Sequence, residues 1–181
     1  LQYRFRVSLE NFGVSTPTTE LTKQVIDVAR PNVSFEKMTI DIYNSRVYLA
    51  GKHTWDPITL NLREDVNNNV QKLVGEQLQK QFDFYEQSSA ASGQDYKFTT
   101  RIEILDGGNG ANTPTVLETF ELYGCYLESA NYNQLAYSNS KDPVSIALNI
   151  QYDNAVQSPQ GTGIGTAIGR TVNTLVTGGG A

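Results

Sequence analysis

The 181-residue sequence contains only one cysteine, one histidine, one methionine and one tryptophan. A single cysteine, Cys125, excludes an internal disulfide, and it excludes a structural zinc site made of several thiolates. The single histidine, His53, has no neighbour in a recognisable nucleophile motif, so neither a catalytic triad nor a metal site is indicated around it. Cys125 has no basic neighbour that would lower its pKa, and we interpret it as a small packed side chain. We therefore expect a protein without cofactor, without metal and without enzymatic activity.

The sequence also lacks long apolar runs and clusters of positive charge. No run approaches the roughly 20 apolar residues that a membrane helix needs, so we expect no membrane span. The start of the chain opens directly into a strand pattern, and we expect no signal peptide there. The net charge is −5 and the lysines and arginines are scattered singly. This distribution argues against tight binding to a phosphate backbone, which requires several clustered cations.

Alternating apolar residues dominate what is present. This pattern predicts strands over residues 1–9, 38–42, 46–49, 58–62, 98–104, 116–124 and 144–152, with a shorter extended piece over 24–29. Spacings of three and four predict one amphipathic helix over residues 65–82, with Asp65 or one of Asn67 to Asn69 as its N-cap. The predicted fold is mainly β: an antiparallel sandwich or partly closed barrel with one flanking helix.

We expect one β domain over residues 1–156 and a glycine- and threonine-rich extension over residues 157–181. The stretch GTGIGTAIG in the extension resembles a phosphate-binding loop, but it lies outside any strand–helix unit and no Lys-Ser or Lys-Thr follows it. We do not interpret it as a nucleotide site.

The stretch FEKMTIDIYNSRVYLAG, residues 35–51, predicts a long hairpin that turns at Asn44-Ser45. Its second face offers Tyr43 and Tyr48 and few charges, instead of the lysines that usually protect an exposed edge. Tyrosines are numerous along the whole chain, a composition typical of protein interfaces where clustered charge is lacking.

Carboxylates leave one enzymatic alternative open. Glu118 and Glu121 lie on opposite faces of one predicted strand, and Glu103 lies on another. Residues that form a glycosidase pair meet only in space, so their spacing along the chain does not exclude a hydrolase. A virion-associated glycan-binding or hydrolytic β domain therefore remains a remote alternative.

The order of these segments is similar to that of the tail tube proteins of contractile-tailed bacteriophages. The resemblance covers residues 1–156 and follows the segments YRFRVSL, KQVIDVARPN, MTIDIYNSRVYLAGKHTWDPITLNL, NNNVQKLVGEQLQKQF and VLETFELYGCYLESANYNQLAYSNSKDPVSIALNIQYDNA. Residues 47–62 and 120–127 carry most of it. A short helical segment that usually precedes the first strand of the family is absent, and the tail after Gln157 is longer than in the simplest members.

The resemblance implies a structural virion protein of the phage tail that is assembled in the host cytoplasm. Its copies would form hexameric rings stacked into a tube, surrounded by a sheath and in contact with tape-measure and baseplate proteins. DNA would pass through the bore without specific binding. A baseplate tube initiator or cap protein with the same core is the alternative.

This assignment implies two sets of site residues. We expect the hairpin to contact sister copies through Met38, Ile40, Ile42, Tyr43, Arg46 and Tyr48. Acidic residues would line the bore, since like charge prevents adhesion of DNA, and the candidates are Glu36, Asp41, Glu103 and Glu121.

Overall fold

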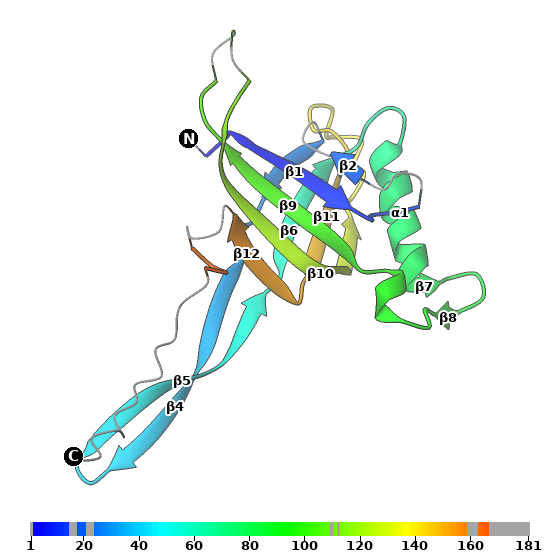
Figure 1. Cartoon of the computed structure of the whole chain (residues 1–181). Coiled ribbons are helices and arrows are strands. Elements are labelled where there is room, and N and C mark those ends of the chain that lie inside the picture. The colour runs from blue at the N-terminus through cyan, green and yellow to red at the C-terminus, as the bar shows by residue number, and fades with distance from the viewer. Residues whose placement is uncertain are drawn as a thin grey trace, which may run out of the picture.

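The protein is an antiparallel β structure folded into two layers, with one helix across their open end and one long hairpin that projects from the body (Figure 1). The computed structural model describes residues 2–14, 18–20, 24–108, 111, 113–158 and 163–166. Most of the predicted extension over residues 157–181 lies outside the described residues. The predicted mainly β fold with one flanking helix is confirmed, and the described strands do not close into a barrel.

The described strands and helices have the following bounds. The strands are β1 (Phe5–Glu10), β2 (Thr18–Glu20), β3 (Val25–Val28), β4 (Asn32–Ile42), β5 (Ser45–Asp56), β6 (Ile58–Arg63), β7 (Phe82–Asp83), β8 (Ser88–Ser89), β9 (Phe98–Leu105), β10 (Val116–Tyr132), β11 (Ser145–Gln151) and β12 (Asn154–Ser158). The helices are α1 (Asn69–Gln81) and a single 3₁₀ turn, Gly93–Asp95.

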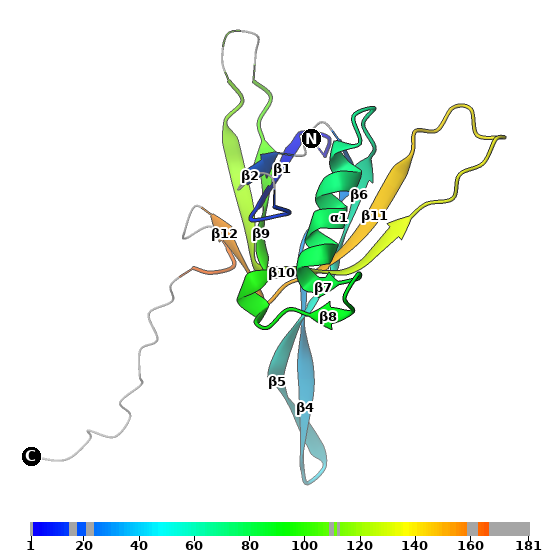
Figure 2. The same cartoon turned by 90° about the vertical axis from the view of Figure 1, so that its right-hand side faces the viewer.

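The main sheet follows the order β2-β1-β9-β10-β11-β6-β3, and β12 also pairs with β10. Strand β10 belongs to both layers. Its first half pairs with β9 and β12, and its second half pairs with β11. Gly124 lies between the two halves with a φ of 66°, a left-handed conformation that favours glycine. The bend lets one strand cross from the first layer to the second, and Figure 2 shows the two layers diverging from it.

The core fills the angle between the layers. Alternate residues of β1, β9 and β10 face alternate residues of β6 and β11 across it, as expected for packed sheets. The buried apolar set is Val7, Leu9, Phe12, Trp55, Ile58, Leu60, Leu62, Val70, Val74, Phe98, Ile102, Phe120, Leu122, Cys125, Leu127, Ile146, Leu148, Ile150, Tyr152 and Ala155. The predicted alternation over 58–62, 98–104 and 144–152 therefore identified core positions correctly, except at Val144, which is exposed and precedes β11.

Helix α1 covers one open end of the two layers and buries Val70, Val74 and Gln77. The side-chain amide of Gln77 accepts a hydrogen bond from the Gly13 amide (3.2 Å) and donates one to the Tyr96 carbonyl (2.6 Å). Gln81 both accepts from and donates to the backbone of Leu127 at 2.9 Å, so its amide takes the place of a neighbouring strand. Buried glutamine is tolerated here because its polar atoms are paired.

Several predicted boundaries differ from the structure. The first strand begins only at Phe5, and both strands of the hairpin are longer than predicted. The helix begins at Asn69 and not at Asp65. Its N-cap is Asn68, one of the predicted candidates, but this residue is left-handed and makes no side-chain capping bond. The strand predicted to end at Gly124 continues to Tyr132, because glycine bends the chain there without ending its pairing. A last strand, β12, follows the strand that the pattern marked as final, and it runs across the predicted boundary at residue 156.

We predict opposite effects of alanine at two glycines. Gly124→Ala places a Cβ atom against the Asp153 side chain in a left-handed conformation and should lower the free energy of unfolding by about 2 kcal/mol. Gly75→Ala is the matched control: it lies in α1, its Cβ meets nothing within 4 Å, and it should raise that free energy by about 0.5–1 kcal/mol. Urea unfolding followed by circular dichroism measures both changes. Equal effects of the two substitutions would contradict the role assigned to Gly124.

We also predict that the Cys125 thiol is inert in the folded protein. It is fully buried beside the bend, and burial raises its pKa from 9.0 to about 11. At pH 8 the thiolate fraction is then about 100-fold lower than in the unfolded chain. A colorimetric thiol reagent should react at least 100-fold more slowly before than after addition of guanidinium. Similar rates in the two states would show that the bend is open to solvent.

Candidate assembly interface

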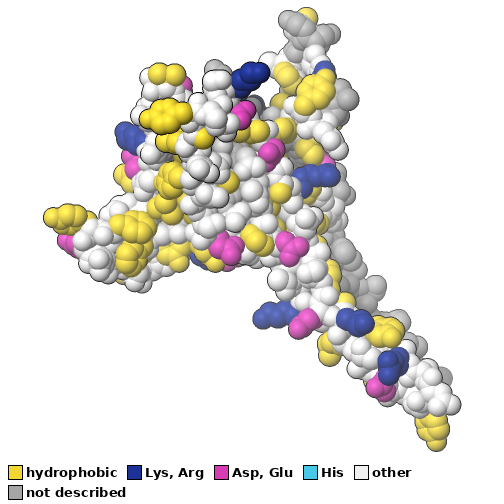
Figure 3. Space-filling view, turned by 180° about the vertical axis from the view of Figure 1, so that it is seen from behind, with side chains coloured by type: hydrophobic (Ala, Val, Ile, Leu, Met, Phe, Trp, Pro, Cys, Tyr) yellow, Lys and Arg dark blue, Asp and Glu magenta, His cyan; other side chains and the backbone are white. Residues whose placement is uncertain are grey.

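The hairpin of β4 and β5 is the most exposed pair of long strands in the described structure. It pairs 11 residues of β4 with 12 residues of β5, whereas typical strands have about 5–6. All of β4 and ten of the twelve residues of β5 are exposed. The space-filling view shows the hairpin as an arm that extends from the body and carries both hydrophobic and charged side chains (Figure 3).

One face of the hairpin is apolar. Met38 pairs with Leu49, Ile40 pairs with Val47, and Ile42 pairs with Ser45. Directly paired residues lie on the same face of an antiparallel ladder. The five apolar side chains of this set, Met38, Ile40, Ile42, Val47 and Leu49, are 42–53% exposed. We call them the apolar face. Glu36 shares this side of β4 by strand alternation.

The opposite face is polar and internally paired. The guanidinium of Arg46 lies 2.9 Å from the Asp41 carboxylate, and the Lys37 ammonium lies 5.1 Å from the centre of the Tyr48 ring. Thr39 pairs with Tyr48 between these contacts. Lys37, Thr39, Asp41, Arg46 and Tyr48 form what we call the polar face. These exposed contacts stabilise the hairpin only weakly.

A row of aromatic rings fixes the root of the hairpin to the body. Phe35 and His53 have ring centres 6.3 Å apart, His53 and Trp55 are 6.2 Å apart, and Trp55 and Tyr152 are 5.6 Å apart. Trp55 and Tyr152 belong to the buried core. His53 lies within β5 and packs between the rings of Phe35 and Trp55. The hairpin is therefore anchored through side chains as well as through its two chain connections.

A bulge near the root changes which residues of β5 share a face with β4. Phe35 pairs with His53, but Lys37 pairs with Ala50, so Gly51 and Lys52 together oppose Glu36. A Cβ atom at Gly51 would lie 3.0 Å from the Glu36 carbonyl oxygen, which favours glycine at this close approach.

The tip differs from the prediction. Ile42 pairs with Ser45, so Tyr43 and Asn44 form the two-residue turn, one position earlier than the predicted Asn44-Ser45. Tyr43 has a φ of 52° and a fully exposed side chain. Two-residue hairpin turns need left-handed φ values, and a tyrosine there is uncommon. The turn therefore presents an exposed aromatic ring at the tip of the hairpin.

The structure divides the six predicted contact residues between three places. Met38, Ile40 and Ile42 lie on the apolar face, Arg46 and Tyr48 lie on the polar face, and Tyr43 lies at the tip. Sequence reasoning missed Val47 and Leu49, which complete the apolar face. The alternation of Val47 and Leu49 was visible in the sequence, but the register that places them beside Ile40 and Met38 depends on the turn.

The four predicted bore carboxylates do not gather on one surface. Glu36 and Asp41 lie on opposite sides of the hairpin. Glu103 lies on β9, paired with Arg6, and Glu121 lies on β10, where it pairs with Arg101 at 3.3 Å and accepts a hydrogen bond from Tyr123. The last two carboxylates share the outer surface of the first layer and are both compensated by an arginine.

The described residues contain no constellation typical of catalysis or metal binding. No group of three or more His, Cys, Asp or Glu side chains among them is placed to hold a metal ion. Glu118 accepts a hydrogen bond from Gln157, and Glu121 lies on the opposite face of the same strand. Within the same described ranges, α1 and the 3₁₀ turn are too short or too polar to cross a bilayer.

Known structures provide the comparison, because no family model and no curated protein match the sequence. A chain of the 6-fold symmetrised anti-feeding prophage baseplate is 13% identical, with a TM-score of 0.62 over 87% of this chain and 93% of that one. A chain of the PVC sheath–tube complex, an extracellular contractile injection system, is 15% identical, with a TM-score of 0.59 over 86% and 88%.

A third similar structure is the SPP1 tail tube, which is 10% identical, with a TM-score of 0.53 over 87% of this chain and 77% of that one. The resemblance that the sequence suggested is therefore matched by tertiary structure along most of the chain. The protein has the fold of phage tail tubes and contractile injection systems.

Proposed function

We propose that the protein is a structural subunit of the tube of a phage tail or of a phage-like injection system, and that its hairpin joins it to sister copies. The fold supports this proposal, since similar chains come from a tail tube and from a sheath–tube complex. The main observation behind the proposal is the hairpin. An isolated two-stranded ribbon is only marginally stable in water, and this ribbon is unusually long and exposed, so contact with another copy would stabilise it.

The free energy gained by burying the apolar face can be compared with the cost of association. Burying the exposed half of each side chain of the apolar face contributes about 1 kcal/mol, or roughly 5 kcal/mol for the five. Association costs on the order of 4–15 kcal/mol in lost freedom of motion. One hairpin contact alone therefore does not hold two copies firmly. In a closed ring or a stack each copy makes several contacts, and their sum stabilises the assembly.

We propose a hexameric ring as the repeating unit, with a sheath outside and tape-measure and baseplate proteins as further partners. The 6-fold symmetrised baseplate that contains a similar chain supports the ring size. Similar chains come from a baseplate as well as from a sheath–tube complex, so the fold is compatible with a repeated tube subunit and with a baseplate initiator. We favour the repeated subunit.

A non-adhesive bore is part of the same proposal. The net charge of −5 would repel DNA weakly, whereas a cationic surface would bind its phosphates. Glu103 and Glu121 remain our candidates for the bore wall. With Glu10, Arg6 and Arg101 on the same surface, the charge there is three negative against two positive. Such a surface is hydrated and nearly neutral, so a passing polyanion would meet few cations.

We expect the wild-type protein to form rings or tubes when concentrated, and Ile40→Asp to prevent this. The substitution places a carboxylate in the centre of the apolar face, where burial costs several kcal/mol. The concentration needed for assembly should rise at least about 100-fold. Negative-stain images and light scattering during a concentration series measure it.

Thr39→Asp is the matched control, because it adds the same charge at the adjacent position on the polar face. It should change the assembly concentration by less than about fivefold. A wild-type protein that stays monomeric at millimolar concentration would contradict the proposed function. Assembly into tubes of unlimited length favours the repeated subunit, whereas single rings favour an initiator or a cap.

A further inference from the structure

The open side of the two layers, opposite the bend in β10, forms a cleft of about 840 Å³. The start of β1 and the residues preceding it line one wall, and β3 lines the other. Phe5, Ile104, Val25 and Val28 pack against the core at its base, and Ile102 is fully buried there. Tyr3 and Ile26 add two more exposed apolar side chains. The cleft is therefore an apolar hollow that the described part of the chain leaves uncovered.

Strand edges also flank this cleft. β3 pairs only with β6, and β1 pairs with β2 only over Ser8, Leu9 and Glu10. Among the described residues, the edge of β1 near Phe5 and the outer edge of β3 therefore have no neighbouring strand. Bare edges beside an apolar hollow favour association with another chain.

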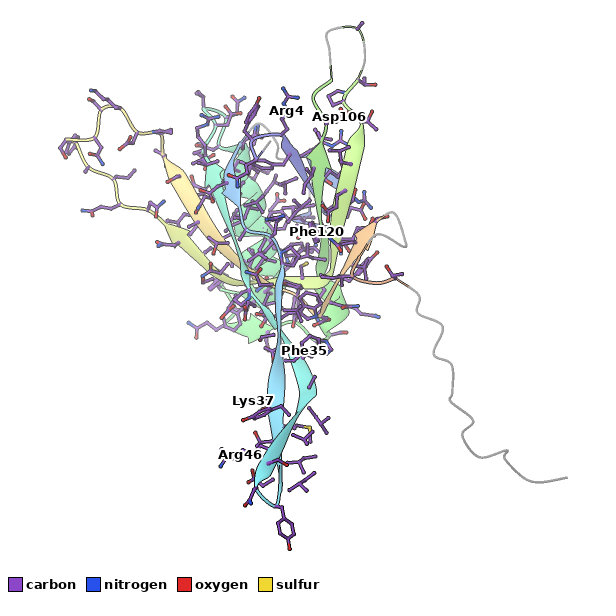
Figure 4. All side chains as sticks on the ribbon, turned by 90° about the vertical axis from the view of Figure 1, so that its left-hand side faces the viewer. Arg4, Phe35, Lys37, Arg46, Asp106 and Phe120 are labelled. Atoms are coloured by element: carbon purple, nitrogen blue, oxygen red, sulfur yellow. The ribbon has the colours of Figure 1, made fainter. Side chains whose placement is uncertain are left out.

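The hairpin of the same copy points away from this cleft. Only residues 29–31 separate β3 from β4, and the aromatic row at the root fixes the direction of the hairpin. Figure 4 shows Arg4, which lines the cleft, at one end of the body, and Lys37 and Arg46 on the hairpin beyond the other end. An apolar projection and an apolar hollow at opposite ends of one molecule suit contact between successive copies.

Charges at the two surfaces are complementary. Glu36 is the carboxylate on the same side of β4 as the apolar face, and Arg4 and Arg30 lie at the cleft. Within the described ranges, neither Glu36 nor Arg30 has an ion-pair partner in its own chain. The carboxylate that lines the cleft, Asp27, does not pair with Arg30 and instead accepts a hydrogen bond from Asn61 at 2.7 Å. Glu36 on the hairpin and Arg30 at the cleft therefore offer opposite charges, neither of which has an ion pair within its own chain in the described ranges.

We infer that the apolar face of one copy lies in the cleft between β1 and β3 of the next copy, with Glu36 near Arg30. This inference rests on the proposed function, because it takes a second copy as the partner of the hairpin. The two contacting surfaces differ, so the interface is head-to-tail and either closes into a ring or continues as a stack. Glu36 then lies in an interface and does not line the bore.

Complementation between two variants tests this arrangement. Ile40→Asp damages the hairpin and leaves the cleft intact, whereas Ile26→Asp damages the cleft and leaves the hairpin intact. Ile26 is 49% exposed, so its substitution should not disturb folding. Each variant alone should remain monomeric. At millimolar concentration an equimolar mixture should form weak one-to-one dimers and nothing larger, because only one hairpin and one cleft remain functional and a single contact does not hold two copies firmly. Sedimentation equilibrium at that concentration measures the masses without dilution.

Three results would overturn the inference. Assembly of Ile26→Asp at the same concentration as the wild type would show that the cleft receives nothing. Dimers of Ile26→Asp alone would show that hairpins pair with hairpins. A mixture that stays monomeric at millimolar concentration, where the wild type assembles, would show that the two surfaces do not meet. Val66→Asp, at an exposed apolar position outside the cleft, is the control and should assemble normally. Failure of the wild type to assemble would instead contradict the proposed function itself.

A charge exchange tests the pairing of Glu36 with Arg30. Glu36→Arg and Arg30→Glu should each raise the assembly concentration about tenfold, since each replaces attraction by repulsion. The double variant should restore assembly to within about threefold of the wild type. Both positions are exposed, so circular dichroism spectra should not change. If the increases in assembly concentration instead add up in the double variant, Glu36 and Arg30 do not contact each other across the interface.

Discussion

The bend of β10 at Gly124 is the constraint on which the rest of the structure depends. Because one strand is shared by both layers, the apolar sides of its two halves face a single core. The layers diverge from the bend, and α1 covers one open end through paired glutamine side chains. The side opposite the bend stays open between β1 and β3. The same backbone feature therefore produces the core and leaves the cleft.

The hairpin depends on this core through its root. Trp55 and Tyr152 are buried, and their contact with His53 and Phe35 carries the packing outward from the body. Beyond this row the hairpin relies on its own ladder and on weak contacts of the polar face. A projection that is rigid at its base loses little freedom when it binds, and this lowers the entropic cost of assembly. A mobile arm with the same apolar face would bind less well.

Much of the fold could be predicted from the sequence because alternation reports which side of a strand is buried. The core positions of β6, β9 and β11 and the amphipathic helix followed from that pattern. Strand ends and turns were predicted less well, because the chain bends or turns there without an interruption of the apolar alternation. Gly124 was interpreted as a strand end, yet the pairing continues beyond it. The turn at Tyr43 and Asn44 was placed one residue late because Tyr43 is an unusual residue for a left-handed position.

For the candidate interface, too, the sequence determined one part and the tertiary structure the other. Local alternation by itself determined that residues 38–49 form a hairpin with more apolar surface than one copy needs, since the periods of strands depend only on neighbouring residues. Only the tertiary structure decided which side chains share a face, because register depends on the turn and the bulge. Only the tertiary structure brought β1 beside β3 to form a cleft, since these strands meet through the folded sheet and not through their own sequences.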